Sequence, residues 1–293
     1  MPSYIEPLFR PPSEAGSLIF QITLGCSQNQ CTFCGMYKGK PFRLKPLDEV
    51  LSEIDAIPAA YRLRVSRVFL ADGDALVYPF DRLVQILDHL SQTFTNLTRV
   101  GSYASPASLA GKNAAQLEVL RQKKLRIVYF GLESGDDGTL AAINKGFNAD
   151  QMVELALKAR AAGMKLSVTA ILGLAGKDRS LSHARSTAAW VNRVNPEYFS
   201  LLTLFHRHND DFIRNLRQCT RGELLLEARE LVTSLNPEKT ILRSNHVSNF
   251  LNLAGNYPKD RLRLMAEVDS AIAMAATIPG YLDTPPEYAE EYY

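Results

Sequence analysis

The sequence predicts an α/β fold built on a parallel β-sheet, and two observations support this. From residue 17 onward, short apolar runs rich in β-branched and aromatic residues alternate with longer segments whose apolar positions recur every three or four residues. Each strand and helix pair takes roughly 30 to 35 residues, as expected of a strand followed by a crossover helix. Because consecutive parallel strands need such a crossover, an open doubly wound sheet and a full or partial (β/α) barrel both satisfy the pattern.

The expected elements follow in order along the chain. Pro46 precedes the first helix, and Asn148 and Asp150 open a later helix that ends at Gly163. Strands are expected at 17–24, 67–71, 96–102, 126–132, 165–173 and 198–205, and helices between them at 47–57, 78–92, 114–123, 149–163 and 180–194.

The C-terminal part has a different rhythm. From residue 206 the alternation ends, and a loop rich in Asn and Ser is expected at 241–257. Helices are expected at 210–218, 221–235 and 258–276. The predicted organisation is an N-terminal extension (1–16), a core (17–205), a helical C-terminal extension (206–280) and a loose acidic tail (281–293).

The composition predicts a soluble cytoplasmic protein. With 293 residues, 46% of them hydrophobic, the chain can bury a large core. The 33 Lys and Arg against 31 Asp and Glu leave no overall charge that favours nucleic acid or an anionic membrane. The N-terminus has no apolar stretch of signal-peptide length, and no apolar run is long enough to span a bilayer.

Three of the four cysteines, Cys26, Cys31 and Cys34, form a C-x4-C-x2-C cluster that suits a loop around a metal or an iron-sulfur cluster. A structural zinc site needs a fourth Cys or His nearby, and a plant-type [2Fe-2S] ferredoxin needs a fourth cysteine, for which only the distant Cys219 is available. A third interpretation is a [4Fe-4S] cluster with three protein thiolates. Its remaining iron then keeps an open coordination position for a reacting ligand.

This arrangement resembles the radical S-adenosylmethionine (radical SAM) superfamily, in which three cysteines follow the first strand of a βα series. The usual spacing there is C-x3-C-x2-C with an aromatic residue before the last cysteine; Phe33 matches that aromatic, and the spacer 27–30 is one residue longer. Residues 129–146 resemble the branch that contains the coproporphyrinogen-oxidase-like proteins and the tRNA methylthiotransferases. The resemblance implies a partial (β/α)6 TIM-like barrel over 17–205, a [4Fe-4S] cluster on the three cysteines, and S-adenosylmethionine on the open iron.

The resemblance also places cofactor contacts at the ends of the second and third strands. Residues 70–79 correspond to the family's Gly-rich motif for the amino group of S-adenosylmethionine, with Gly73 and Asp74 in the matching positions. A glycine lets the backbone approach a ligand closely, and a carboxylate complements an ammonium group. An ordinary Asp-Gly turn explains the same residues. Ser102 and Tyr103, at the end of the third strand, face the same rim if the strands are parallel.

Later strand ends supply the remaining contacts that the resemblance implies. Glu133 and Ser134 correspond to residues that contact the ribose or methionine part of the cofactor, and Lys145 to a base that meets its carboxylate. A helix-end charge that interacts favourably with the helix dipole explains Lys145 equally well. Gly173 fits the segment whose apolar backbone flanks the adenine, although Lys177 stands where many relatives have Glu.

The activity that the resemblance implies is oxidoreductase-like: reductive cleavage of S-adenosylmethionine to a 5'-deoxyadenosyl radical, which abstracts hydrogen from an unidentified substrate. It implies an external reductant of the flavodoxin or ferredoxin type. A small-molecule substrate is favoured over nucleic acid, because the sequence has no obvious RNA-binding module. A non-catalytic iron-sulfur or haem-binding protein on the same fold is the alternative. His206, His208 and the polar loop 243–250 are candidate substrate contacts.

Overall fold

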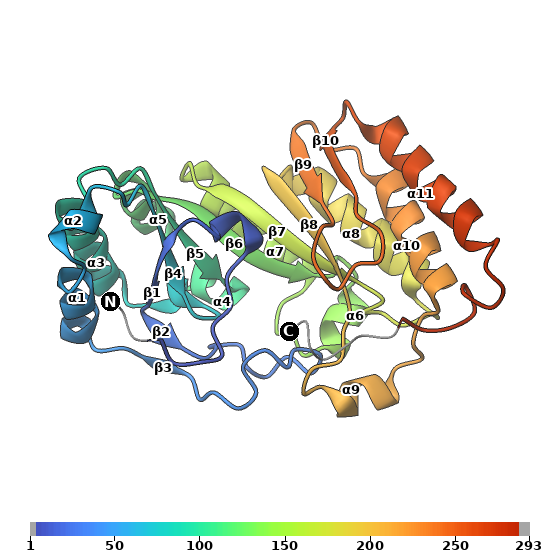
Figure 1. The fold of residues 1–293 in the computed structure, drawn as a ribbon, viewed down its shortest axis with the longest axis horizontal. Helices are drawn as coiled ribbons and strands as arrows, with labels where there is room; N and C mark the ends of the chain where they lie inside the picture. Colours follow the sequence, from blue (N-terminus) through green and yellow to red (C-terminus); the bar gives the residue numbers. More distant parts are fainter. Residues whose placement is uncertain (1–3, 287–293) are drawn as a thin grey trace. The chain divides into compact units, whose positions relative to one another are not determined.

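A computed structural model describes residues 4–286 of the chain (Figure 1). Its central feature is a mostly parallel sheet of eight strands with helices, which confirms the predicted α/β fold. All six strands expected from the sequence are present. The chain divides into two compact units: residues up to 29, 36–130 and 154–166 form the first, and residues 30–35, 131–153 and 167 onward form the second.

The first unit contains the N-terminal strands and their helices. Its elements are η1 (Pro12–Glu14), β1 (Leu18–Gln21), β2 (Thr23–Leu24), β3 (Arg43–Leu44), α1 (Leu47–Asp55), α2 (Ala59–Arg62), β4 (Arg67–Ala71), η2 (Ala75–Val77), α3 (Phe80–Thr93), β5 (Arg99–Ala104), α4 (Pro106–Ala110), α5 (Ala114–Gln122), most of β6 (Leu125–Glu133) and the C-terminal part of α7 (Ala149–Ala161). β4 pairs in parallel with β1 and β5, and β5 pairs in parallel with β6. Phe20, Phe69, Val100 and Val128, one from each of these strands, are completely buried and form the core.

A separate two-stranded ladder lies at the start of the cysteine-rich segment. β2 pairs antiparallel with β3, with Thr23 opposite Leu44 and Leu24 opposite Arg43. Residues 25–42 therefore leave and return at the same place, and these residues form the cysteine loop.

The second unit contains the remaining strands. Beside the end of β6 and the start of α7, its elements are α6 (Asp137–Ala142), β7 (Lys165–Leu172), α8 (Ser180–Val194), β8 (Tyr198–Thr203), α9 (Asp210–Asn215), α10 (Arg221–Ser234), β9 (Thr240–Arg243), β10 (Ala254–Tyr257) and α11 (Arg261–Ala275). β8 pairs in parallel with β7 and β9, and β10 closes the edge antiparallel to β9. Figure 1 shows α10 between α8 and α11, and α10 contacts both.

The C-terminal extension is not only helical, which corrects one expectation. Residues 241–257 were expected to be a loop, but β9 and β10 occupy its two ends. β9 follows β8 through α9 and α10, so it continues the strand and helix alternation of the core. Both strands have only four residues, and the polar Asn256 of β10 points outward in an alternating exposed and buried pattern. Such short polar strands carry little signal in a sequence.

Both terminal segments make specific contacts where the structure describes them. Glu14, in the predicted N-terminal extension, is completely buried and accepts hydrogen bonds from Arg99 (2.8 Å) and Tyr129 (2.5 Å). At the other end, the backbone N–H groups of Arg221 and Gly222 donate to the carbonyls of Thr284 and Leu282. The predicted loose tail is therefore attached to the start of α10 over its first residues, and 287–293 lie outside the described residues.

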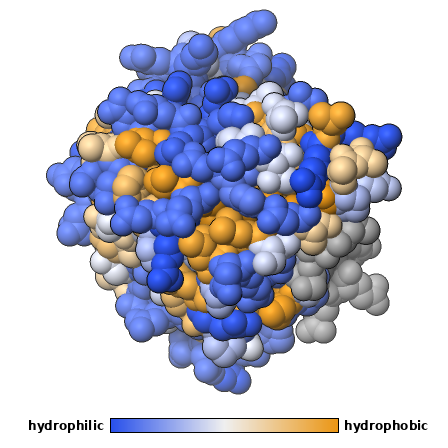
Figure 2. All heavy atoms as spheres, turned by 90° about the vertical axis from the view of Figure 1, so that its left-hand side faces the viewer, coloured by the Kyte–Doolittle hydropathy of each residue, from blue (hydrophilic) through white to orange (hydrophobic). Residues whose placement is uncertain are grey.

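The surface shows mixed polarity. The face at the left of Figure 1 is mostly hydrophilic with several separate apolar patches (Figure 2). Tyr61 and Leu63, in and after α2, are among the exposed large apolar side chains. Between residues 4 and 286, the chain has no helix with the length and hydrophobicity required to span a lipid bilayer.

Candidate active site

The cysteine loop carries the three predicted ligands. Cys26 belongs to the first unit, whereas Cys31 and Cys34 belong to the second, where the N–H of Cys34 lies 3.4 Å from the carbonyl of Cys31. Within residues 4–286, no three His, Cys, Asp or Glu side chains are grouped so that they would hold one metal ion. Cysteine thiolates are the ligands that iron-sulfur clusters take, and there each thiolate binds a different iron. The three cysteines therefore fit a cluster by their chemistry and number, as a set of three that leaves one iron open.

The tip of the cysteine loop is held by the second unit. The N–H of Thr32 donates to the carbonyl of Ile143 (3.0 Å), just after α6. The side chain of Asn209, directly before α9, donates to the carbonyl of Phe33 (2.8 Å), and the Phe33 ring meets Phe212 edge to face at 6.5 Å. Phe33, which matches the family's aromatic residue before the last cysteine, thus anchors the loop between Cys31 and Cys34.

Gly73 and Asp74 follow β4 in the first unit and contact the start of the loop. A Cβ atom added to Gly73 would lie 2.7 Å from the Cβ of Cys26, so only glycine fits beside that cysteine. The buried Asp74 carboxylate accepts from Ser27 Oγ (2.5 Å) and from the N–H and Oγ of Ser105 (2.9 and 2.6 Å), the N-cap of α4. Three protein donors already bind this carboxylate, so its observed role is to hold Ser27, while its predicted contact with the amino group of S-adenosylmethionine stays a prediction.

Ser102 lies within β5 and is completely buried. Its hydroxyl donates to the carbonyl of the next residue, Tyr103, at 2.9 Å. The Tyr103 ring packs edge to face against Phe69 (5.1 Å) and Tyr129 (6.1 Å), and burial raises the pKa of the Tyr103 hydroxyl. In this structure Ser102 therefore contributes to the interior of the first unit, and its contact with a cofactor stays a prediction.

Glu133 and Lys145 are brought together in the second unit. Lys145 Nζ donates to Glu133 Oε1 at 3.0 Å, and only 6% and 13% of the two side chains are exposed. Glu133 has a φ of 63°, in the left-handed region, and its carboxylate turns back over Gly131, where a Cβ atom would lie 2.2 Å from Oε1. The two residues that the sequence assigned to separate parts of one cofactor thus form one partly buried ion pair.

Ser134 and Gly173 meet in a buried polar network of the second unit. Ser134 Oγ lies 2.7 Å from His183 Nδ1, and the N–H of Gly173 donates to Glu227 Oε1 at 2.9 Å. His183 Nε2 lies 3.5 Å from that oxygen, and Ser180 Oγ donates to Oε2 at 2.5 Å. Burial lowers the pKa of His183 to about 4 and raises that of Glu227 to about 7. His183 thus contacts Ser134, just after β6, and Glu227 contacts the backbone of Gly173, just after β7.

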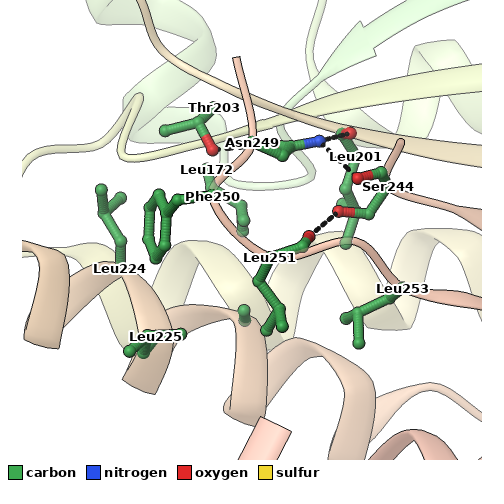
Figure 3. Close-up of a pocket in the computed structure, with 11 residues that line it drawn as sticks. Leu172, Leu201, Thr203, Leu224, Leu225, Ser244, Asn249, Phe250, Leu251 and Leu253 are labelled. Atoms are coloured by element: carbon green, nitrogen blue, oxygen red, sulfur yellow. Dashed lines mark hydrogen bonds between the residues drawn. The ribbon is translucent and has the colours of Figure 1, made fainter. Parts of the chain in front are cut away.

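Part of the predicted polar loop binds the end of β8, while Asn245, Val247 and Phe250 in the same loop are exposed. Figure 3 shows Asn249 over the end of β8, where its Nδ2 donates to the carbonyls of Leu201 (2.8 Å) and Ser244 (3.0 Å). Thr203, the last residue of β8, donates from its hydroxyl to Asn249 Oδ1 at 2.7 Å. A small, mostly apolar pocket remains beneath, lined in part by Phe250.

Two of the predicted substrate contacts, His206 and His208, follow β8 in the chain. His206 and His208 are exposed in the segment after β8, and His208 has a φ of 49°. In the polar loop, the His246 ring stacks on Phe205 at 6.2 Å, and burial lowers its pKa. A substrate contact by any of these residues remains a prediction.

Several residues of the site were missed by the sequence analysis. Asp72, Lys40 and Tyr37 meet at the base of the cysteine loop, and His183 and Glu227 join the network beneath Gly173. A signal existed for the first group, because Tyr37 and Lys40 lie three and six residues after the last cysteine and Asp72 precedes Gly73. The second group joins two helices far apart in the sequence and had no local signal.

Comparison with known proteins identifies the family. A family model described as the radical SAM superfamily matches residues 20–184, more than half of the chain. A putative methylthiotransferase of Methanocaldococcus jannaschii is 26% identical over 153 residues, which cover 49% of this chain and 32% of that protein. The chain therefore spans about a third of the length of this curated relative.

Solved structures show the same fold at low sequence identity. Methylornithine synthase has a TM-score of 0.53 at 14% identity, covering 92% of this chain and 83% of that one. Coproporphyrinogen III oxidase from Escherichia coli, a radical SAM enzyme, has a TM-score of 0.52 at 16% identity, covering 68% and 46%. A radical S-adenosylmethionine methyltransferase from Kitasatospora setae, with cobalamin and a [4Fe-4S] cluster bound, has a TM-score of 0.51 at 15% identity, covering 64% and 34%. With its three-cysteine loop inside the matched segment, the chain belongs to the radical SAM superfamily of enzymes.

Proposed function

We propose that the protein binds a [4Fe-4S] cluster through Cys26, Cys31 and Cys34 and cleaves S-adenosylmethionine reductively, so that hydrogen can be abstracted from a small-molecule substrate. The observation that carries the proposal is a loop with three cysteines, closed by β2 and β3, inside the segment that matches the radical SAM family. When bound, the cluster supplies the electron that splits the cosubstrate into methionine and a 5'-deoxyadenosyl radical. The proposal includes a cytoplasmic location and an external reductant of the flavodoxin or ferredoxin type.

The residues of the chain bind and orient the cosubstrate. Gly73, Glu133 and Gly173 lie at strand ends, where parallel α/β folds carry their sites. Lys145 Nζ donates to Glu133 Oε1 at 3.0 Å, which holds the ammonium in place, and the proposal assigns this ammonium to the carboxylate of the cosubstrate. Gly73 has no side chain and therefore allows the backbone after β4 to approach Cys26 closely. The proposed contacts are Phe33, Gly73, Asp74, Ser102, Glu133, Ser134, Lys145 and Gly173.

The test is anaerobic reconstitution followed by product analysis. Wild-type protein with iron, sulfide, S-adenosylmethionine and dithionite should show absorbance near 400 nm and release 5'-deoxyadenosine. The Cys34→Ser variant should lose both. Cys219→Ser is the matched control and should keep both, because Cys219 is buried outside the loop and burial raises its pKa to about 12, which keeps the thiol protonated.

The control experiment also separates the alternative function. A protein that holds the cluster and releases no 5'-deoxyadenosine would contradict the enzyme proposal and favour a non-catalytic iron-sulfur protein. Loss of the cluster in Cys219→Ser with retention in Cys34→Ser would contradict the ligand assignment.

A further inference from the structure

One buried carboxylate, Asp72, contacts both ends of the cysteine loop. Its Oδ2 accepts the N–H of Gly25 at 3.0 Å, directly before Cys26. The same oxygen lies 2.5 Å from Nζ of Lys40, which follows Cys34 in the chain. The Asp72 side chain is completely buried and that of Lys40 is 6% exposed, so the pair is shielded from water. The carboxylate therefore connects the point where the loop leaves β2 to the point where it returns.

The remaining acceptor and donor capacity of this ion pair is also used. Asp72 Oδ1 lies 3.4 Å from the hydroxyl of Tyr37 and 3.3 Å from Nε2 of Gln21. Lys40 Nζ donates in addition to the carbonyls of Ile5 (2.5 Å) and Pro7 (2.9 Å). A buried charge is tolerated when it is paired and hydrogen-bonded in this way, and the contacts then impose one geometry on the groups that make them.

Gly73, the residue after Asp72, packs directly against Cys26. A Cβ atom added to Gly73 would lie 2.7 Å from the Cβ of Cys26 and 2.7 Å from Cε2 of Tyr37. The end of β4 therefore packs directly against the first cysteine and against the returning arm of the loop. Displacement of Asp72 would displace this surface as well.

A second buried carboxylate of the same unit provides the comparison. Glu14 is also completely buried and pairs with Arg99 at 2.8 Å and with Tyr129 at 2.5 Å. These partners all lie outside residues 25–42. Glu14 is thus buried and paired like Asp72, although its cation Arg99 is 25% exposed against 6% for Lys40, and of the two carboxylates Asp72 is the one that contacts the cysteine loop.

We propose that Asp72 and Lys40 form a clamp that holds the two arms of the cysteine loop together and positions Cys26 for the cluster. Both are positioning residues, since neither is a proposed ligand. The clamp restricts the loop before the cluster binds, so less conformational entropy is lost on binding. Mutation of a group that orients a metal ligand commonly weakens retention of the metal. The inference rests on the proposed function, because the cluster is the group that the positioned cysteine would bind.

The experiment compares Asp72→Asn with Glu14→Gln in the full-length protein. After anaerobic reconstitution, iron is counted per chain, and the loss of iron to the chelator bathophenanthroline is followed with time. We expect Asp72→Asn to lose iron about tenfold faster than wild type. Glu14→Gln should lose iron at the wild-type rate, even where its melting temperature falls as much. Equal rates for Asp72→Asn and wild type, or equally raised rates for both variants, would overturn the clamp.

A readout without the cluster distinguishes failure of the clamp from failure of the proposed function. Amide hydrogen exchange of the protein before reconstitution should be faster at residues 25–40 in Asp72→Asn and unchanged there in Glu14→Gln. If wild-type protein takes up no iron, the proposed function fails, and this exchange pattern still supports or overturns the clamp on its own.

Should Asp72→Asn not fold because Lys40 is left as an unpaired charge, the double variant Asp72→Asn with Lys40→Met removes both charges together. It should show the same fast iron loss and fast exchange, and wild-type behaviour in both would overturn the clamp. The Lys40→Arg variant keeps a cation beside Asp72, and iron loss from it as slow as from wild type would support the clamp further.

Discussion

Asp72 in the first unit and Glu227 in the second are both completely buried. Asp72 accepts the backbone N–H of Gly25, next to Cys26, and Glu227 accepts that of Gly173, a predicted site residue. They differ in what else surrounds them. Asp72 has a lysine ammonium at 2.5 Å, whereas Glu227 has the Ser180 hydroxyl and a histidine nitrogen at 3.5 Å. Burial raises the pKa of both carboxyl groups, and Lys40 opposes that shift at Asp72.

The difference shows that one kind of side chain serves two purposes according to its counter-charge. A buried carboxylate beside a cation is held as an ion and fixes the chain segments that contact it. A buried carboxyl group beside neutral donors retains its proton near neutral pH and responds to pH. The first arrangement suits the base of a loop that must stay in place, and the second links stability of the second unit to protonation.

Removal of the cation at Asp72 should have the largest effect. In Lys40→Met the Asp72 carboxylate stays buried without its counter-ion, and we expect the free energy of unfolding to fall by about 3 kcal/mol at pH 7. Urea denaturation at constant m-value measures this. Lys123→Met is the control, because its ion pair with Asp88 is substantially exposed and its loss should change stability by less than about 1 kcal/mol. Equal effects of the two substitutions would show that burial of the Asp72 pair is energetically unimportant.

Variants of the second network should show opposite pH dependence of stability. In the folded state Glu227 keeps its proton up to about pH 7, whereas the unfolded chain releases it near its ordinary pKa of 4.5. Its contribution to the free energy of unfolding is therefore present at low pH and is lost as pH rises from 4.5 to 7. His183 behaves in the opposite way: its folded pKa of about 4 lies below the ordinary 6.5, so stability rises between those values.

In wild-type protein these two dependences oppose each other between about pH 4.5 and 6.5. Glu227→Gln leaves only the histidine contribution, so stability should rise with pH across that range. His183→Gln leaves only the carboxyl contribution, so stability should fall. We expect changes on the order of 2 kcal/mol in each direction, measured as thermal or urea unfolding at several pH values. Slopes of the same sign in the two variants would contradict the assignment of the two protonation states.

Sequence analysis found those strands and helices that have long periodic patterns, and those candidate ligands that lie close together in the chain. The six core strands and the cysteine loop were found because apolar periodicity and C-x4-C-x2-C are local features. β10, with the residues AGNY, lacks a run of β-branched or aromatic residues and was missed. The assignment of Asp74 to a ligand stays a prediction, and the sequence did not reveal that its carboxylate binds Ser27 and Ser105, because a side chain's partners depend on which segments return beside it.

The Asp72 clamp illustrates the same limit. Lys40 meets Asp72 only because β3 pairs with β2 and brings the end of the loop back to its start. Glu133 and Lys145 were both selected from one short motif, but their spacing of twelve residues did not predict that they pair with each other at 3.0 Å. Which of these side chains meet depends on how the folded chain brings distant segments together, and residue type alone does not predict it.

Loss of one hydrogen bond from a neutral donor to Glu227 or to Asp72 should have the smallest effect on the free energy of unfolding. The two losses should still differ in size. Ser180→Ala removes a 2.5 Å donor from Glu227, and we expect a loss of about 1 kcal/mol in the free energy of unfolding at pH 7. The pKa of Glu227 should rise further, because that hydroxyl favours the ionised form. Tyr37→Phe removes only a 3.4 Å contact from Asp72, which keeps Lys40 and Gly25, so the loss should stay below about 0.5 kcal/mol. Urea unfolding at pH 7 measures both, and a larger loss in Tyr37→Phe than in Ser180→Ala would mean that the tyrosine, rather than the lysine, secures the Asp72 carboxylate.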